Sequence, residues 1–272
     1  MILDGKLVVK EIREKLEKEV LGNEITLAIV VVGENSSSAS YIKGVMKTSE
    51  KLGVKVKIIK TDEDVSTKEI IEKINELNID DSINGIMIQM PLPKTIDQIK
   101  VINSISYLKD ADGLTDISMG KLVKNTGGGF LPCTPLAILK TIEYYDIEIE
   151  GMDVVVIGRS NIVGKPIASI LTNKGATVTV CHSKTKNLKE KTRNADMVIV
   201  AIGRKHFLTE DMVNENAVII DVGINVVDGK LYGDVDYENL INKVKAITPV
   251  PGGIGTITNT LLIKNTVDSY LK

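Results

Sequence analysis

The chain has 272 residues, enough for one large domain or two smaller ones. Hydrophobic residues make up 43% and charged residues 26%, which is typical of a globular protein, and the net charge of -2 excludes an electrostatic case for binding nucleic acid or an anionic membrane. We find no apolar run of about 18 residues and no signal-peptide core, so no membrane span is expected. Cys133 and Cys181 are far apart and form no C-x-x-C motif, which predicts no metal site and no disulfide framework, and favours a reducing cytoplasm.

Apolar spacing predicts alternating helices and strands in the first half of the chain. In chain order, we expect a helix over 8–20, a strand over 27–32, a helix from Ser36 to about Gly53, a strand over 54–59, a helix after a Ser66–Glu69 capping box, and a strand over 85–89. Pro91 and Pro93 stop the third strand. The first half therefore contains a three-stranded α/β unit.

The middle segment, 109–132, is less periodic and is interpreted as a linker. Thr134 and Pro135 then predict the N-cap and first position of a helix that runs to Tyr145. Beyond it we expect a strand from Asp153, a helix from Gly164, strands over 177–181, 197–202 and 218–222, and a last helix from about Ile257. The predicted fold class is α/β, with two α/β domains and a cleft between them.

The segment from Val154 to Pro166 (VVVIGRSNIVGKP) carries the strongest functional signal. It predicts a buried strand, a glycine-bounded turn and a helix start, which is the beginning of a nucleotide-binding βαβ unit. Backbone N–H groups at such a helix N-terminus bind a pyrophosphate where glycines allow close approach. Gly158 and Gly164 lie six residues apart, unlike the common G-x-G-x-x-G fingerprint. The alternative is a glycine turn in an ordinary α/β domain.

The next strand ends in Cys181-His182-Ser183-Lys184, without the acidic residue that NAD enzymes use for the ribose hydroxyls. Arg159 lies in the preceding turn. The Ser183 hydroxyl, with the cations Lys184 and Arg159 near it, suits a 2′-phosphate. The cofactor is therefore predicted to be NADP rather than NAD. Neither histidine is paired for a hydrolytic triad: His182 is interpreted as a cofactor-loop residue and His206 as a surface residue.

Four further features have both a functional and a structural interpretation. Tyr41 either stacks on an aromatic ligand or is a half-buried helix residue, and Gln89 either faces a site at the end of its strand or bonds the backbone. Asp110 and Asp112 either bind a ring edge rich in amines or form an Asx turn before the following glycine. The Pro- and Gly-rich segment 249–255 either approaches a ligand closely or only connects two elements.

Seven segments in this order resemble the methylenetetrahydrofolate dehydrogenase/cyclohydrolase family over essentially the whole chain. They are QMPLP (89–93), KDADGL (109–114), FLPCTP (130–135), GRSNIVGKP (158–166), TVCHSKT (179–185), DVGIN (221–225) and TPVPGGIG (248–255). The resemblance implies a folate-binding catalytic domain over 1–118 and 253–272, a Rossmann-type NADP-binding domain over 119–252, and a homodimer. The implied partners are tetrahydrofolate one-carbon derivatives.

The resemblance also implies roles for individual residues. Tyr41 would stack on the folate, Gln89 would line the site and Asp112 would bind the pterin; these three are the implied catalytic residues. The implied cofactor-binding residues are Gly158, Arg159, Ser160, Ser183 and Ile224, and substrate is also expected at Pro251, Gly252 and Gly253.

One departure concerns the second activity of the family. Hydrolysis of the methenyl compound uses the lysine of a Tyr-x-x-x-Lys helix motif, and counting from Tyr41 places Val45 at that position. Lys43 is about 200° around the helix from Tyr41, and a valine moves no proton. We therefore predict an NADP-dependent methylenetetrahydrofolate dehydrogenase with weak or absent cyclohydrolase activity. The alternatives are a full bifunctional enzyme and a non-catalytic protein that binds NADP or folate.

Overall fold

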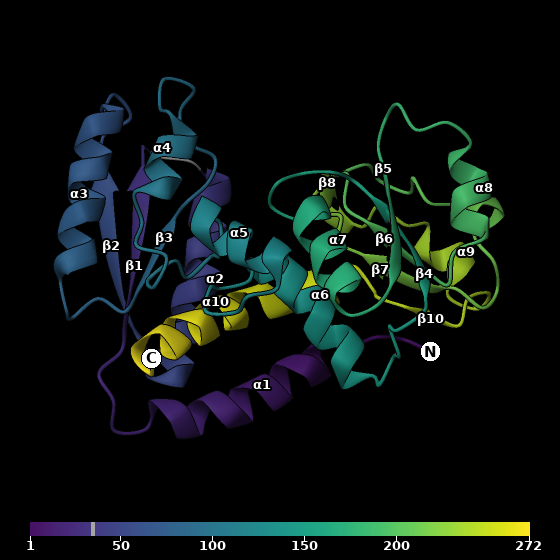
Figure 1. Ribbon diagram of the computed structural model, residues 1–272, viewed down its shortest axis with the longest axis horizontal. Coiled ribbons are helices and arrows are strands. Elements are labelled where there is room, and N and C mark those ends of the chain that lie inside the picture. The colour runs from purple at the N-terminus through teal and green to yellow at the C-terminus, as the bar shows by residue number, and fades with distance from the viewer. Residues whose placement is uncertain (34–35) are drawn as a thin grey trace. The chain divides into compact units, whose positions relative to one another are not determined.

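The computed structural model describes residues 1–33 and 36–272 (Figure 1). The chain divides into two compact units. One, the three-stranded unit, consists of Glu11–Cys133 and Asn259–Lys272; the other, the five-stranded unit, consists of Met1–Lys10 and Thr134–Thr258. Within the described part of the chain, no helix is both long and apolar enough to cross a membrane.

The three-stranded unit is built on a parallel sheet in the order β2-β1-β3. Its strands are β1 (Thr26–Val32), β2 (Lys55–Thr61) and β3 (Gly85–Ile88). β1 is the central strand because its apolar, largely β-branched sequence suits burial on both faces. The helices within this unit are α2 (Ser36–Leu52), α3 (Thr67–Ile79), α4 (Gln98–Asn103) and α5 (Asp116–Lys124).

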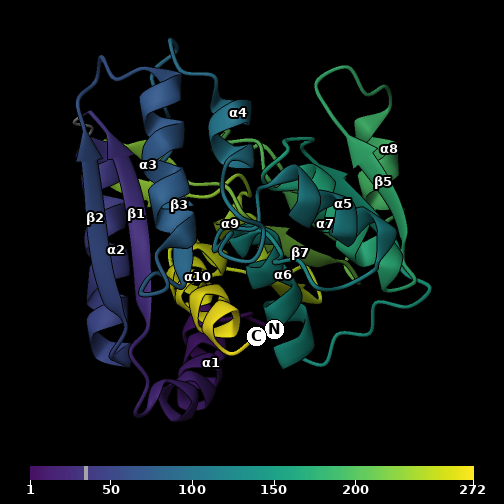
Figure 2. The same ribbon diagram turned by 60° about the vertical axis from the view of Figure 1, so that its left-hand side comes forward.

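Helices α2 and α3 lie on opposite faces of this sheet (Figure 2), as right-handed crossovers to either side of β1 require. α3 and α4 bury the side chains of one face, and the cluster includes Val30, Ile70, Ile86 and Val101. The predicted capping box of α3 is confirmed, because the Ser66 hydroxyl accepts from the Glu69 N–H while the Glu69 carboxylate accepts from the Ser66 N–H.

The five-stranded unit has a parallel sheet in the order β10-β7-β6-β4-β5. Its strands are β4 (Asp153–Ile157), β5 (Thr177–Cys181), β6 (Met197–Val200), β7 (Val218–Asp221) and β10 (Ala246–Ile247). Its other elements are α7 (Gly164–Asn173), α8 (Leu188–Arg193), the 3₁₀ helix η1 (Glu210–Met212), α9 (Tyr237–Leu240) and the antiparallel hairpin of β8 (Asn225–Val227) and β9 (Lys230–Tyr232). α7 packs on β4 and β5.

Three helices cross or border the divisions between the units: α1 (Gly5–Val20), α6 (Cys133–Tyr144) and α10 (Ile254–Tyr270). α6 begins one residue before the predicted Thr134 cap, and α10 begins three residues before the predicted Ile257. The predicted linker over 109–132 contains α5, whose start is set by the Thr115 side chain accepting from the Ser118 N–H. A nine-residue helix is too short to give strong apolar periodicity.

The N-terminal residues group with the five-stranded unit, which no local pattern predicts. Leu3 N–H donates to the Ile247 carbonyl at 2.8 Å and Ile247 N–H donates to the Met1 carbonyl at 3.0 Å, so the chain start extends the edge at β10. The units divide at 133/134 and 258/259, and the predicted domain bounds of 118/119 and 252/253 stay a prediction. The α/β class with two units built on parallel sheets is confirmed, and the cleft between them stays a prediction.

Candidate functional site

Tyr41, Asp112 and Cys133 form an electrostatically coupled group in the three-stranded unit. Burial raises the pKa of the Tyr41 hydroxyl far above its ordinary value, and the neighbouring Asp112 and Cys133 add to the rise. Burial also raises the pKa of Asp112 to about 7, although hydrogen bonds from the Cys133 thiol and backbone N–H oppose that rise. The structure thus places an aromatic ring beside a carboxyl group that titrates near neutral pH.

The two acids that the sequence left ambiguous have different roles. The Asp110 carboxylate is buried and accepts hydrogen bonds from the Leu114 and Thr115 N–H groups and from the Ser118 hydroxyl, at 3.1, 2.9 and 2.8 Å. Asp110 therefore holds the turn at Gly113, whose φ is +68°. With the turn held by Asp110, the half-buried Asp112 is not needed for the turn and is able to accept from a ligand.

Asn265 of α10 supports this turn and was not singled out by the sequence. Its side-chain N–H₂ donates to the Ala111 carbonyl at 2.9 Å and to the Leu131 carbonyl at 3.2 Å. The residue is only 2% exposed, so its amide satisfies these carbonyls in the interior, and the Ala111 carbonyl also accepts from the Cys133 thiol at 3.5 Å. An asparagine among the apolar residues of the last helix is the one sequence signal that points to Asn265.

Gln89 lies at the carboxyl end of β3, where ligands bind in open parallel sheets. Its side chain is 9% exposed and its Nε2 donates to the Met90 carbonyl at 2.6 Å. Its Oε1 is buried and has no hydrogen-bond partner among the described residues. Gln89 thus makes the backbone bond of the structural interpretation and still has a free acceptor.

The α2 face that carries Tyr41 also carries Val45, which is 0% exposed. Lys43 and Lys47 are both exposed and lie on another face of the helix. At Gly44, a Cβ would lie 2.8 Å from the Asn259 Nδ2, so the Asn259 side chain of α10 lies against α2 at this position. No lysine of α2 therefore shares the buried face with Tyr41.

In the five-stranded unit, the glycine turn after β4 has the compactness that the sequence predicts. Gly158 has φ of +127°, and a Cβ there would lie 2.5 Å from the Ala201 carbonyl oxygen. A Cβ at Gly164 would collide with the Gly158 carbonyl. The Ser160 hydroxyl accepts from the Val163 N–H at 3.1 Å at the start of α7, and Arg159 is exposed beside it. These residues fit a dinucleotide phosphate cradle.

The loop after β5 is held by its own hydrogen bonds. The Thr185 hydroxyl accepts from the His182 N–H at 2.8 Å, and the His182 Nδ1 accepts from the Lys184 N–H at 3.1 Å. His182 thus acts as a loop-shaping residue. Ser183 is exposed, and no carboxylate follows β5 before Glu190 of α8.

Ile224 and the Pro- and Gly-rich segment line one cavity of about 200 Å³ at the carboxyl edge of β7. Ile224 is 60% exposed. The cavity also receives Leu231 from β9 and residues 249–253, which include the expected substrate positions Pro251, Gly252 and Gly253. The structure therefore brings together Ile224 and the 249–253 loop, which are distant in the sequence.

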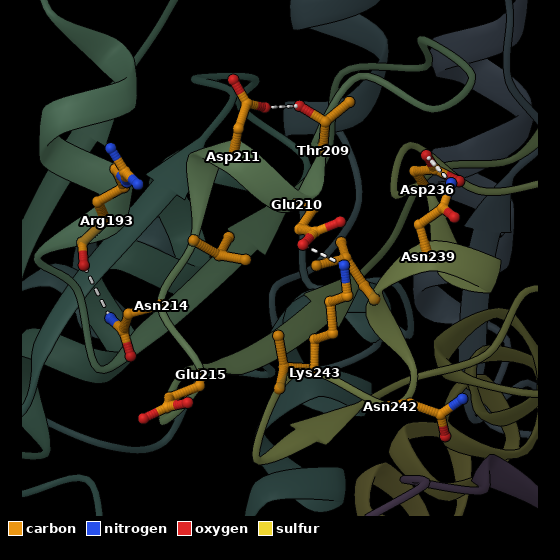
Figure 3. Close-up of a pocket in the computed structure, with 13 residues that line it drawn as sticks. Arg193, Thr209, Glu210, Asp211, Asn214, Glu215, Asp236, Asn239, Asn242 and Lys243 are labelled. Atoms are coloured by element: carbon orange, nitrogen blue, oxygen red, sulfur yellow. Dashed lines mark hydrogen bonds and ion pairs between the residues drawn. The ribbon is translucent and has the colours of Figure 1, made fainter.

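A larger hollow, of about 750 Å³, lies elsewhere in this unit (Figure 3). Arg193, Glu215 and Val244 line it just before β6, β7 and β10, so it opens at the amino edge of the parallel sheet. Figure 3 shows the Glu210–Lys243 ion pair among its lining side chains, and the Asp211 carboxylate accepting from the Thr209 hydroxyl. Its position away from the ligand-binding edge excludes it as the main site.

Comparison with known proteins identifies the family. Residues 3–112 match the model "Tetrahydrofolate dehydrogenase/cyclohydrolase, catalytic domain", and residues 132–272 match the model "Tetrahydrofolate dehydrogenase/cyclohydrolase, NAD(P)-binding domain". The chain belongs to the tetrahydrofolate dehydrogenase/cyclohydrolase family. The five-stranded unit accordingly contains an NAD(P)-binding domain.

Relatives match along nearly the whole chain. The bifunctional protein FolD of Clostridium novyi (strain NT) is 49% identical over 269 residues, covering 97% of this chain and 96% of that protein. The crystal structure of the bifunctional FolD enzyme from Campylobacter jejuni has a TM-score of 0.97 and 44% identity, and covers 100% of this chain and 98% of that one. The Trypanosoma brucei FolD structure, complexed with NADP and an inhibitor, has a TM-score of 0.94 and 30% identity over 100% of this chain and 97% of that one.

Proposed function

We propose that this protein oxidises 5,10-methylenetetrahydrofolate to 5,10-methenyltetrahydrofolate with NADP, in one-carbon metabolism. The observation that carries the proposal is the coupled group of Tyr41, Asp112 and Cys133 in a chain of this family. An aromatic ring beside a carboxyl group suits a pterin, which offers a flat face and N–H donors along one edge. The alternative is a non-catalytic protein that binds NADP or folate, and NADP reduction by the purified protein separates the two.

The roles of the chain's residues follow from what each side chain offers. Tyr41 stacks on the folate, Asp112 accepts hydrogen bonds from the pterin, and Gln89 uses its unpartnered Oε1 toward the substrate. Pro251, Gly252 and Gly253 approach the substrate with backbone groups. Because the pteridine nitrogen lone pair supports the departure of hydride, alignment matters more than a strong base.

The residues around the β4–α7 turn fit NADP better than NAD. Gly158, Ser160, Ser183 and Ile224 hold the dinucleotide, and the Arg159 guanidinium pairs with the 2′-phosphate. Exposure of Arg159 and the absence of an acid just after β5 support this choice. Bound NADP supplies the acceptor for the hydride.

We further propose that the cyclohydrolase activity is weak or absent. Val45 occupies the position of the family's lysine and is 0% exposed, while Lys43 and Lys47 lie on another face of α2. The unpartnered Gln89 Oε1 supports the loss of a donor from this site. Full bifunctionality is the competing proposal, and the bifunctional names of the relatives favour it.

A paired assay of the wild-type protein tests both steps. We expect reduction of NADP with accumulation of the methenyl compound. We expect hydrolysis of that compound to be about 10²–10⁴-fold slower than in an enzyme with the motif lysine, which is the usual effect of losing a general base. Spectroscopic measurement of NADPH and of methenyl- and 10-formyltetrahydrofolate separates these outcomes. Efficient formation of the 10-formyl product contradicts the loss, and absence of NADP reduction contradicts the enzyme proposal altogether.

The variant Val45→Lys addresses the missing group directly. A partly desolvated lysine has a lowered pKa and is able to relay a proton from water, so we expect a rise in hydrolysis with Val45→Lys. Val45→Met keeps the site apolar and serves as the matched control, for which no rise is expected. Equal hydrolysis by both variants contradicts the assignment of Val45.

Two further properties belong to this proposal. We expect a homodimer, as the family resemblance implies, and sedimentation of the purified protein measures it. We also place the protein in the cytoplasm, which agrees with the free thiols of Cys133 and Cys181.

A further inference from the structure

Asp234 lies just after the β8–β9 hairpin, 0% exposed, and its carboxylate accepts an unusual set of hydrogen bonds. The donors are the consecutive backbone N–H groups of Ile202, Gly203 and Arg204, at 2.7, 3.0 and 2.6 Å. With Gly203 at φ of +63°, these groups form an anion-binding concavity at the carboxyl end of β6. The protein fills this concavity with its own carboxylate, so it is not available to a phosphate of a ligand.

The same carboxylate reaches the loop that carries Ile224. Asn225 donates from Nδ2 to the Asp234 Oδ1 at 3.0 Å. A Cβ at Gly223 would collide with the Asp234 carboxyl group, so glycine is required for this approach. Asp234 therefore joins the loop after β6 to the loop after β7.

Asp221 is 2% exposed and binds the segment that carries Asp234, as Asp234 binds the segment that follows Asp221. Its carboxylate accepts from the N–H groups of Gly223, Asp234 and Val235 at 3.0, 2.9 and 2.9 Å. A Cβ at Gly233 would collide with this carboxylate in turn. Each aspartate thus holds the chain segment of the other, and Asp221 itself lines the cavity formed by Ile224, Leu231 and residues 249–253.

We propose that Asp234 is a positioning residue of this dehydrogenase: by tying the Ile224 loop to the end of β6, it sets where that loop meets the bound dinucleotide. The inference rests on the proposed function, in which Ile224 contacts NADP. The physical reason is that hydride transfer depends steeply on alignment. Ile224 is 60% exposed, so little of its position is fixed by burial, and the bonds of the carboxylates to Gly223 and Asn225 on either side of it in the chain set that position.

Two variants and one control test the proposal. Asp234→Asn keeps the shape but turns an N–H₂ group toward backbone N–H donors. Asn225→Ala removes the Nδ2 bonds to the Asp234 Oδ1 and to the Tyr232 carbonyl from a partly exposed residue, so it folds even if the first variant does not. Asp236→Asn is the matched control: within the described structure, the carboxylate of this neighbouring acid accepts only from the exposed Asn239 side chain. Each protein is assayed for NADP affinity, kcat, and the isotope effect with methylene-deuterated substrate.

Positioning predicts that kcat falls roughly 10- to 100-fold in Asp234→Asn and by a smaller factor in Asn225→Ala, while the isotope effect rises because the chemical step becomes slower. Amide exchange of 202–204 and 222–225 accelerates in both variants, a readout independent of activity. Unchanged kcat and isotope effect in folded variants overturn the proposal and leave Asp234 a purely structural residue. Failure of the wild type to bind or reduce NADP instead overturns the proposed function.

Discussion

The carboxyl group of Asp112 shows how burial of one residue sets a pH response. Its pKa is raised by burial, and secondarily by the Asp110 charge, from 3.8 to about 7. The native state therefore binds this proton more tightly than the unfolded chain does. The contribution of Asp112 to the free energy of unfolding consequently falls as the pH rises from about 4 to about 7.

Asp112→Asn tests the ligand role of this residue. Because the ionised carboxylate is the better acceptor for pterin N–H groups, wild-type folate affinity is expected to fall as the pH drops through about 7. The variant should bind folate more weakly and without this pH dependence, with NADP affinity nearly unchanged and with no loss of thermal stability. Folate titrations between pH 6 and 8.5 measure this, with the exposed Asp116→Asn as control. Loss of stability with intact folate affinity would make Asp112 a turn residue.

Arg159 is the residue on which cofactor choice depends. Loss of one charge-assisted contact to the 2′-phosphate costs about 1.5–3 kcal/mol, so Arg159→Ala should weaken NADP roughly 10- to 150-fold and NAD much less. Binding titrations with both cofactors measure the ratio. Lys165→Ala is the control, because Lys165 is exposed in the same region and its Nζ bonds to Asn161. Equal weakening of both cofactors contradicts the assignment.

At the scale of elements, α10 holds the turn that carries Asp112. Asn265 makes this connection through its bonds to the Ala111 and Leu131 carbonyls. The Cys133 Sγ lies 3.8 Å from the same Nδ2, so the N-terminus of α6 meets α10 at this point. The position of Asp112 therefore depends on three elements that no local sequence pattern connects.

Asn265→Ala should lower stability by about 1–3 kcal/mol, because the Leu131 carbonyl loses its Asn265 donor while the Ala111 carbonyl keeps the Cys133 thiol. Folate affinity should fall with it, since the support of the Asp112 turn is lost, whereas NADP affinity should not change. Denaturant unfolding together with ligand titration measures both effects. Asn242→Ala, an exposed change in the five-stranded unit, is the control. An unchanged folate affinity would show that α10 does not position Asp112.

At the scale of the whole molecule, binding of NADP to the native state should stabilise the protein by mass action. At a cofactor concentration of about 100 times Kd the gain is about 2.7 kcal/mol, provided that the unfolded chain does not bind. Thermal unfolding with NADP and with NAD at equal concentration should therefore show a higher Tm with NADP. Equal shifts with the two cofactors would contradict the predicted preference.

The sequence by itself determined the alternation of helices and strands, the capping box at Ser66 and the glycine turn at Gly158. These features follow from apolar periodicity and from backbone stereochemistry, which act over a few residues. The family was equally evident from seven short segments. Short elements such as α5 and the β8–β9 hairpin were missed because their periodicity extends over too few residues.

Only the tertiary structure decided what the ambiguous residues do. It separated the roles of Asp110 and Asp112, showed the Gln89 Oε1 without a partner among the described residues, and buried Val45. It also paired the N-terminus with β10. The physical reason is that these outcomes depend on contacts between distant parts of the chain: the bond from Asn265 to Ala111 spans 154 positions. Local propensity contains no information about such partners, because packing and burial select them only in the folded state.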